Sequence, residues 1–96
     1  MKARYLRPAR RELHEAIEYY EQQRPGLGRE FRDEVYATVD RIKALPAAWR
    51  PMSPNTRRCP TRRFPYGVIY AVERDELVII AIAHAHRDTN YWKDRI

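Results

Sequence analysis

The end of the chain holds side chains that could do acid–base or metal chemistry. The stretch "AHAHRDTNYW", residues 83–92, places two histidines two positions apart, followed by an arginine, a tyrosine and a tryptophan. In a strand, His84 and His86 would point to the same face. Histidine titrates near neutral pH and is a common metal ligand, so both kinds of chemistry have to be weighed.

A metal site needs more ligands than this pair supplies. Neither Cys59 nor His14 stands at a recognisable ligand spacing from the two histidines. The single cysteine also excludes an internal disulfide framework, and there is no glycine-rich phosphate loop. We therefore predict no metal site and no cofactor.

What remains is a set of arginine, histidine and tyrosine side chains. Attack by an RNA 2′-hydroxyl needs a base, cations for the phosphorane charge and an acid, and these types can supply all three. Arginine and tyrosine are also common anchors of protein interfaces, so composition leaves catalysis and binding both open. The set comprises Arg62, Arg63, Tyr66, Tyr70, His84, His86, Arg87 and Tyr91.

The positive charge gathers in one window of the chain. The formal net charge is +6, and no acidic side chain occurs between Asp40 and Glu73. Such a run predicts an anionic partner, namely nucleic acid, a nucleic-acid enzyme or an acidic peptide, although a solvated basic loop is the plain alternative. Five arginines of the window are Arg50, Arg57, Arg58, Arg62 and Arg63.

Helical periodicity dominates the first half of the chain. Apolar residues at helical spacing predict a helix that begins near Pro8 and ends at "RPG", residues 24–26. A second apolar stripe runs from Leu27 to Leu45 and stops at Pro46. The short connection implies an antiparallel helical hairpin.

Strand periodicity follows, after a proline-rich stretch at 46–60 that we expect to be a connector or an extended arm, anchored by Trp49. Residues 66–72 predict one strand and 77–86 a second, apolar on both faces and therefore central. In the second strand, Val78, Ile80 and Ile82 are expected to share one face. Residues 2–6 could add a short first strand.

These elements predict one α+β domain over residues 1–96, with the N-terminal helical hairpin packed on one face of a small antiparallel sheet. The opposite face is expected to stay open, bordered by arginines and tyrosines. The longest apolar run, residues 77–83, is too short to span a bilayer, so we expect a cytoplasmic protein without membrane contact.

Three ordered stretches carry a family resemblance: "AIEYYEQQRPGLGREF" (16–31), "RRFPYGVIYAV" (62–72) and "AHAHRDTNYWKDR" (83–95). Together they resemble the RelE/ParE superfamily of bacterial type II toxins, most of all its ParE, or plasmid-stabilisation, branch. The resemblance implies a toxin held in a hetero-oligomer by a cognate antitoxin with an acidic wrapping segment. Such a complex contacts DNA only through the antitoxin.

Two activities divide the superfamily. RelE-like members cut mRNA on the ribosome, and ParE-like members poison DNA gyrase. Aligned with the ribonuclease branch, Gly67 and Ala85 stand where that branch has arginines, while Tyr91 matches its terminal tyrosine. Each lost transition-state cation should cost about 10²–10³ in rate.

The resemblance therefore favours gyrase inhibition by binding, with ribosome-dependent mRNA cleavage as the alternative. A degenerate member that only binds its antitoxin is a third possibility. For a ribonuclease, the catalytic candidates are Arg63, His84, His86, Arg87 and Tyr91. For binding the antitoxin or the target, they are Arg57, Arg58, Arg62, Arg63, Tyr66, Tyr70, Arg87, Tyr91 and Trp92.

Overall fold

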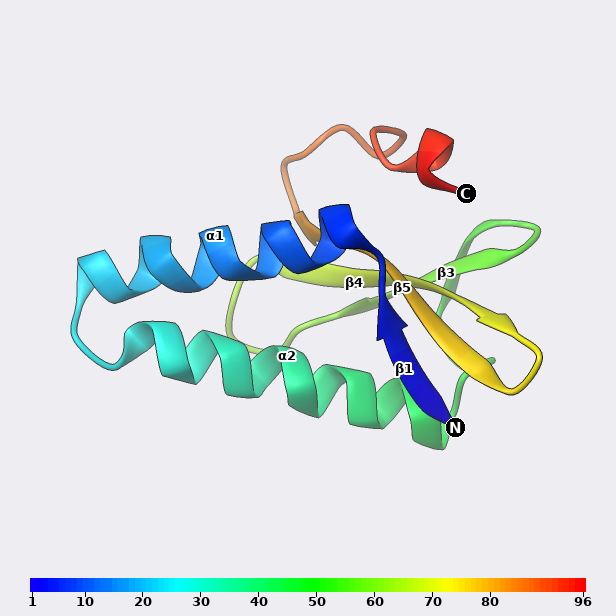
Figure 1. The fold of residues 1–96 in the computed structure, drawn as a ribbon, viewed down its shortest axis with the longest axis horizontal. Coiled ribbons are helices and arrows are strands. Elements are labelled where there is room, and N and C mark those ends of the chain that lie inside the picture. The colour runs from blue at the N-terminus through cyan, green and yellow to red at the C-terminus, as the bar shows by residue number, and fades with distance from the viewer.

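Two antiparallel helices lie against one face of a five-stranded sheet in the computed structural model, which describes residues 1–96 (Figure 1). The strand order is β1-β5-β4-β3-β2. The predicted α+β class, helical hairpin and short first strand are confirmed, but the sheet is mixed because β1 pairs parallel with β5. The elements are β1 (Lys2–Tyr5), α1 (Arg7–Gln23), α2 (Leu27–Ala44), β2 (Arg50–Ser53), β3 (Thr56–Pro60), β4 (Tyr66–Glu73), β5 (Glu76–His84) and a 3₁₀ turn (Lys93–Arg95).

The turn between the helices depends on two glycines. Gly26 has a φ of 90°, a left-handed conformation that costs glycine little. The Glu21 carboxylate accepts the backbone N–H groups of Gly26 and Gly28, each at 3.0 Å. At Gly28 the helices approach so closely that a Cβ would lie 2.6 Å from the Ile17 carbonyl oxygen. The second helix ends at Ala44, one residue before its predicted end. Neither helix is long and apolar enough to cross a membrane.

Residues 46–60, predicted to be a connector or an extended arm, are not an unpaired segment, because residues 50–60 form a hairpin in the sheet. β2 pairs antiparallel with β3, and β3 pairs with β4. The prolines are compatible with this: Pro51 lies in the edge strand, and Pro60 is the last residue of β3, where a missing N–H is tolerated. Trp49 packs against the core as expected.

The register of this hairpin sends Arg58 across β4. The Arg58 guanidinium occupies the space where a Cβ at Gly67 would stand, so only glycine leaves room for it. Arg57, one residue earlier, points to the opposite face.

A β-bulge changes which residues of β5 face the helices. Ile69 pairs with Ala81 and Tyr70 with Ile79, which leaves Ile80 as the extra residue. Ile79 and Ile82 therefore pack toward the helices, while Ile80 packs on the other face. The predicted sharing of one face by Val78, Ile80 and Ile82 is wrong, because strict alternation fails at the bulge.

The bulge lies where β5 has no strand partner on its β1 side. The ladder with β1 stops at Ile79, whose carbonyl still accepts the Leu6 N–H. Beyond it, the Arg95 guanidinium donates to the Ile80 carbonyl at 3.1 Å, and the Glu12 carboxylate accepts the Ile82 N–H at 3.0 Å. The Arg95 guanidinium also donates to both carboxylate oxygens of Glu12, to Oε1 at 3.0 Å and to Oε2 at 2.8 Å. This pair replaces the missing strand.

The C-terminal segment after β5 covers the second face of the sheet (Figure 1). Trp92, 1% exposed, packs there with Val78, Ile80 and Ala81. The prediction of an open second face is therefore wrong over this region, because residues 85–96 fold back onto the sheet.

The two crowded glycines should respond differently to the same substitution. Gly28→Ala should lower the free energy of unfolding by about 1–2 kcal/mol, because the new methyl group meets rigid backbone. Gly67→Ala should change it by less than about 0.5 kcal/mol, because the Arg58 side chain can swing aside. Urea unfolding measures both, and the Arg58 Nε–H resonance should move only in Gly67→Ala. Equal losses of stability in the two variants would contradict the packing described.

The Glu12–Arg95 pair should matter far more than an exposed pair. Arg95→Gln leaves a carboxylate that is only 13% exposed without its cation, so the free energy of unfolding should fall by about 2–3 kcal/mol. Arg4→Gln is the matched control, since the exposed Arg4–Glu76 pair should contribute less than about 1 kcal/mol. Urea unfolding measures the stability of both variants. A similar loss in the two would show that the pair does not replace a strand.

Candidate functional site

The arginines of the basic window do not form one surface. Arg57 lies on the helix-covered side and donates to the Trp49 carbonyl at 2.7 Å. Arg58 lies on the other side of the sheet. The Arg62 N–H donates to Glu34 of α2 at 2.8 Å, and the Arg63 guanidinium pairs with Glu30 of α2 at 2.8 Å.

Two of the predicted binding residues are buried. Tyr70 is 1% exposed and its hydroxyl donates to the Pro46 carbonyl, and burial raises the pKa of Tyr70 to about 12. Trp92 is equally buried. Neither side chain offers a contact surface in this structure.

Tyr66 belongs to an aromatic cluster that joins the helical hairpin to the start of β4. Its ring lies 4.9 Å from that of Phe31 and 6.2 Å from that of Tyr20. Phe64 completes the cluster, 9% exposed and 4.9 Å from Tyr20. Burial raises the pKa of the Tyr66 hydroxyl, with the neighbouring Tyr20 adding to the shift. The "RFPY" motif thus has a packing role.

His84 is the last residue of β5 and lies next to this cluster, whereas His86 lies in the turn that follows, because the strand ends two residues before its predicted end. The His84 ring lies 5.1 Å from Tyr66 and 5.4 Å from His86. The His86 backbone N–H donates to His84 Nδ1 at 3.0 Å. No group of three or more histidine, cysteine, aspartate or glutamate side chains lies close enough to hold a metal ion.

Tyr91 is held between two guanidinium groups. Arg87 lies 4.0 Å and Arg95 4.9 Å from the centre of its ring. The Tyr91 hydroxyl is buried without a hydrogen-bond partner. Burial, and next the Glu12 carboxylate, raises the pKa of Tyr91 well above its usual value. A group of this kind is poorly suited to act as a base at neutral pH.

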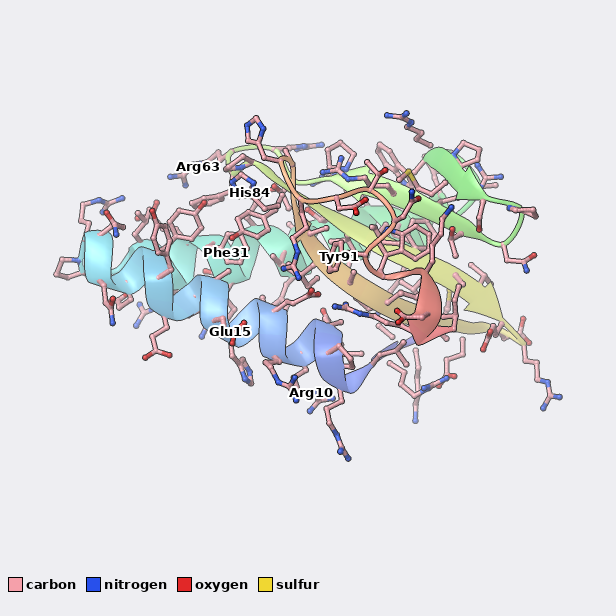
Figure 2. The ribbon with its side chains drawn as sticks, turned by 90° about the horizontal axis from the view of Figure 1, so that it is seen from above. Arg10, Glu15, Phe31, Arg63, His84 and Tyr91 are labelled. Atoms are coloured by element: carbon pink, nitrogen blue, oxygen red, sulfur yellow. The ribbon has the colours of Figure 1, made fainter.

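The five candidates for RNA cleavage do not meet at one point. His84, Arg87 and Tyr91 line one hollow on the second face of the sheet, but Arg63 pairs with Glu30 and the Tyr91 hydroxyl is buried. Figure 2 shows that Arg63 and His84 lie nearer to the turn of the helical hairpin than Tyr91 does. Cys59 offers no nucleophile in their place, because it is fully buried and burial raises the pKa of its thiol.

A different set of arginines does converge. Arg50 of β2, Arg58 of β3 and Arg87 after β5 line one hollow of about 180 Å³ on the second face of the sheet. Burial lowers the pKa of Arg58, and the nearby Arg50 charge lowers it further. Arg50 was missed as a site residue because its stretch was expected to be a connector, and only recognition of the β2–β3 hairpin would have revealed it.

Known proteins similar to this chain were found in two comparisons. A family model of the ParE toxin of the type II toxin-antitoxin system parDE matches residues 3–89. Among solved structures, a chain of the chromosomal ParDE TA system from P. aeruginosa has a similar fold. Its TM-score is 0.78 at 20% identity, over 90% of this chain and 97% of that chain. A search of curated proteins found no significant match.

The match extends from β1 to the segment after β5, so it includes both helices and all five strands. The solved structure has the same fold. The resemblance to the ParE branch of the RelE/ParE superfamily is thus confirmed. The chain belongs to the ParE toxin family of type II toxin–antitoxin systems.

Proposed function

We propose that this chain is a toxin that inhibits DNA gyrase by direct contact and is neutralised by a cognate antitoxin. In this proposal it acts in the cytoplasm, where its target is, and it needs no cofactor. The antitoxin holds it in a hetero-oligomer and provides the only link to DNA.

The observation that favours inhibition by binding over RNA cleavage is the environment of the Tyr91 side chain. A terminal tyrosine that acts on RNA must reach its substrate with its hydroxyl. Here the hydroxyl is buried, Arg87 and Arg95 both lie against the ring, and burial raises the pKa of the hydroxyl. Tyr91 thus acts as a packing element that orients two arginines.

One observation favours the ribonuclease alternative. Gly67 replaces an arginine of the ribonuclease branch, but the Arg58 guanidinium occupies the space beside Gly67. A cation therefore stands close to where that branch places one. Arg58 and Arg87 could bind a phosphate there, with His84 or His86 as the acid or base. The two proposals thus differ in target and can be separated by experiment.

The proposed target predicts the outcome of a supercoiling assay. Purified chain should inhibit ATP-dependent supercoiling of plasmid DNA by gyrase and leave cleaved DNA that is covalently bound to the enzyme. A surface contact requires the native fold, so heat-unfolded protein is the control. Arg29→Gln, which removes one exposed charge from α2, should inhibit like the native sequence.

Two other outcomes would contradict gyrase inhibition. If folded protein at micromolar concentration leaves gyrase unaffected but cuts mRNA on translating ribosomes, the ribonuclease alternative is correct. If it does neither, and expression without the antitoxin leaves growth unchanged, the chain is a member that only binds its antitoxin.

A further inference from the structure

Three arginines and one acidic residue, Asp88, line the hollow on the second face of the sheet. Arg50, Arg58 and Arg87 reach it from three separate elements, and none of them forms an ion pair. A guanidinium group stays protonated under all physiological conditions. By contrast, the structure pairs six other arginines with carboxylates, namely Arg4, Arg24, Arg32, Arg41, Arg63 and Arg95.

Trp92 forms part of the buried wall of the same hollow. It is 1% exposed, and its Nε1–H is buried without an acceptor. An indole N–H can only donate, and leaving it unpaired in the interior is unfavourable. The three guanidinium groups form no hydrogen bond or ion pair, so the hollow is complementary to an oxyanion.

The lining identifies the kind of oxyanion. Half of the lining residues are hydrophobic, with Met52, Ile69 and Ala83 among them. This composition suits a carboxylate carried on a short apolar stem, which is a glutamate or aspartate side chain. The volume of about 180 Å³ is enough for one such group.

A nucleic acid strand fits less well. It would need further cations beside the hollow for the neighbouring phosphates, but Arg57 faces the other side of the sheet. Asp88 also lines the hollow and would repel a polyanion.

We infer that the hollow lined by Arg50, Arg58 and Arg87 binds a glutamate or aspartate side chain of the antitoxin. This inference rests on the proposed function, and it names the contact that anchors the antitoxin's acidic segment. Gly67 provides the space for Arg58, and the C-terminal segment supplies Arg87 and Trp92. The site is therefore complete only when that segment lies on the sheet.

A titration of the free chain tests the site itself. The probe is N-acetyl-glutamate N-methylamide, and the glutamine analogue is the matched neutral control. NMR of the protein measures the binding of both compounds. The glutamate compound should shift the Arg58 Nε–H and Trp92 Nε1–H signals saturably, and the glutamine compound should not. Arg58→Gln and Arg87→Gln should each weaken binding by at least about 10-fold, whereas Arg29→Gln should not.

Three results would overturn the inference. One is the absence of a saturable shift at the two signals, and another is unchanged affinity in both arginine variants with native circular dichroism spectra. The third is tighter binding of a short oligouridylate than of the glutamate compound, which would assign the site to RNA.

A second arm uses the candidate antitoxin, the product of the neighbouring open reading frame. Arg58→Gln and Arg87→Gln should weaken the complex by at least about 10-fold, and added salt should reduce this difference. A complex of native affinity in both variants would contradict the inference and leave the toxin–antitoxin pairing intact. No complex with the unaltered chain would instead contradict the proposed function, whatever the glutamate compound does.

Discussion

The fold depends on how the chain completes the β1-side edge of β5. β1 ends at Tyr5, while β5 continues to His84, so the later part of the central strand has no neighbour on that side. Glu12 and Arg95, 83 residues apart, supply the missing acceptor and donor and neutralise each other. An unpaired backbone group in this position would cost as much as a lost hydrogen bond. One ion pair thus joins α1, β5 and the C-terminal end.

The geometry of the arginine site follows from this junction. Arg95 fixes the end of the chain, which holds Trp92 against the sheet and places Arg87 over Tyr91. Arg58 arrives from β3 through the space that Gly67 leaves. Six arginines form ion pairs within the chain, whereas three unpaired arginines meet at one hollow. A surface of this kind suits a protein that works by binding acidic partners.

Helices, central strands and family could be predicted from the sequence because their signals are local. Spacing of apolar residues marked α1 and α2, and β-branched runs marked β4 and β5. The β2–β3 hairpin was missed because its prolines suggest an irregular segment, although edge positions tolerate them. The bulge at Ile80 leaves no sequence signal, since its neighbours are apolar on both faces.

The site itself was harder to predict, because its members meet only through strand register. Nothing in the sequence shows that Arg57 and Arg58 face opposite sides, or that Arg58 crosses Gly67. Glu12 and Arg95 were not expected to interact, since no local pattern connects residues so far apart. Trp92 was predicted to be a contact residue, and it lies buried under the segment that positions Arg87.

The central claim is that the chain acts on a DNA enzyme by contact rather than on RNA by catalysis. The most direct measurement is whether DNA synthesis or protein synthesis stops first after the chain is induced in growing cells. Pulse incorporation of thymidine reports DNA synthesis, and pulse incorporation of methionine reports protein synthesis. The account predicts that DNA synthesis falls first, while protein synthesis continues. An immediate loss of methionine incorporation with DNA synthesis still under way would contradict it.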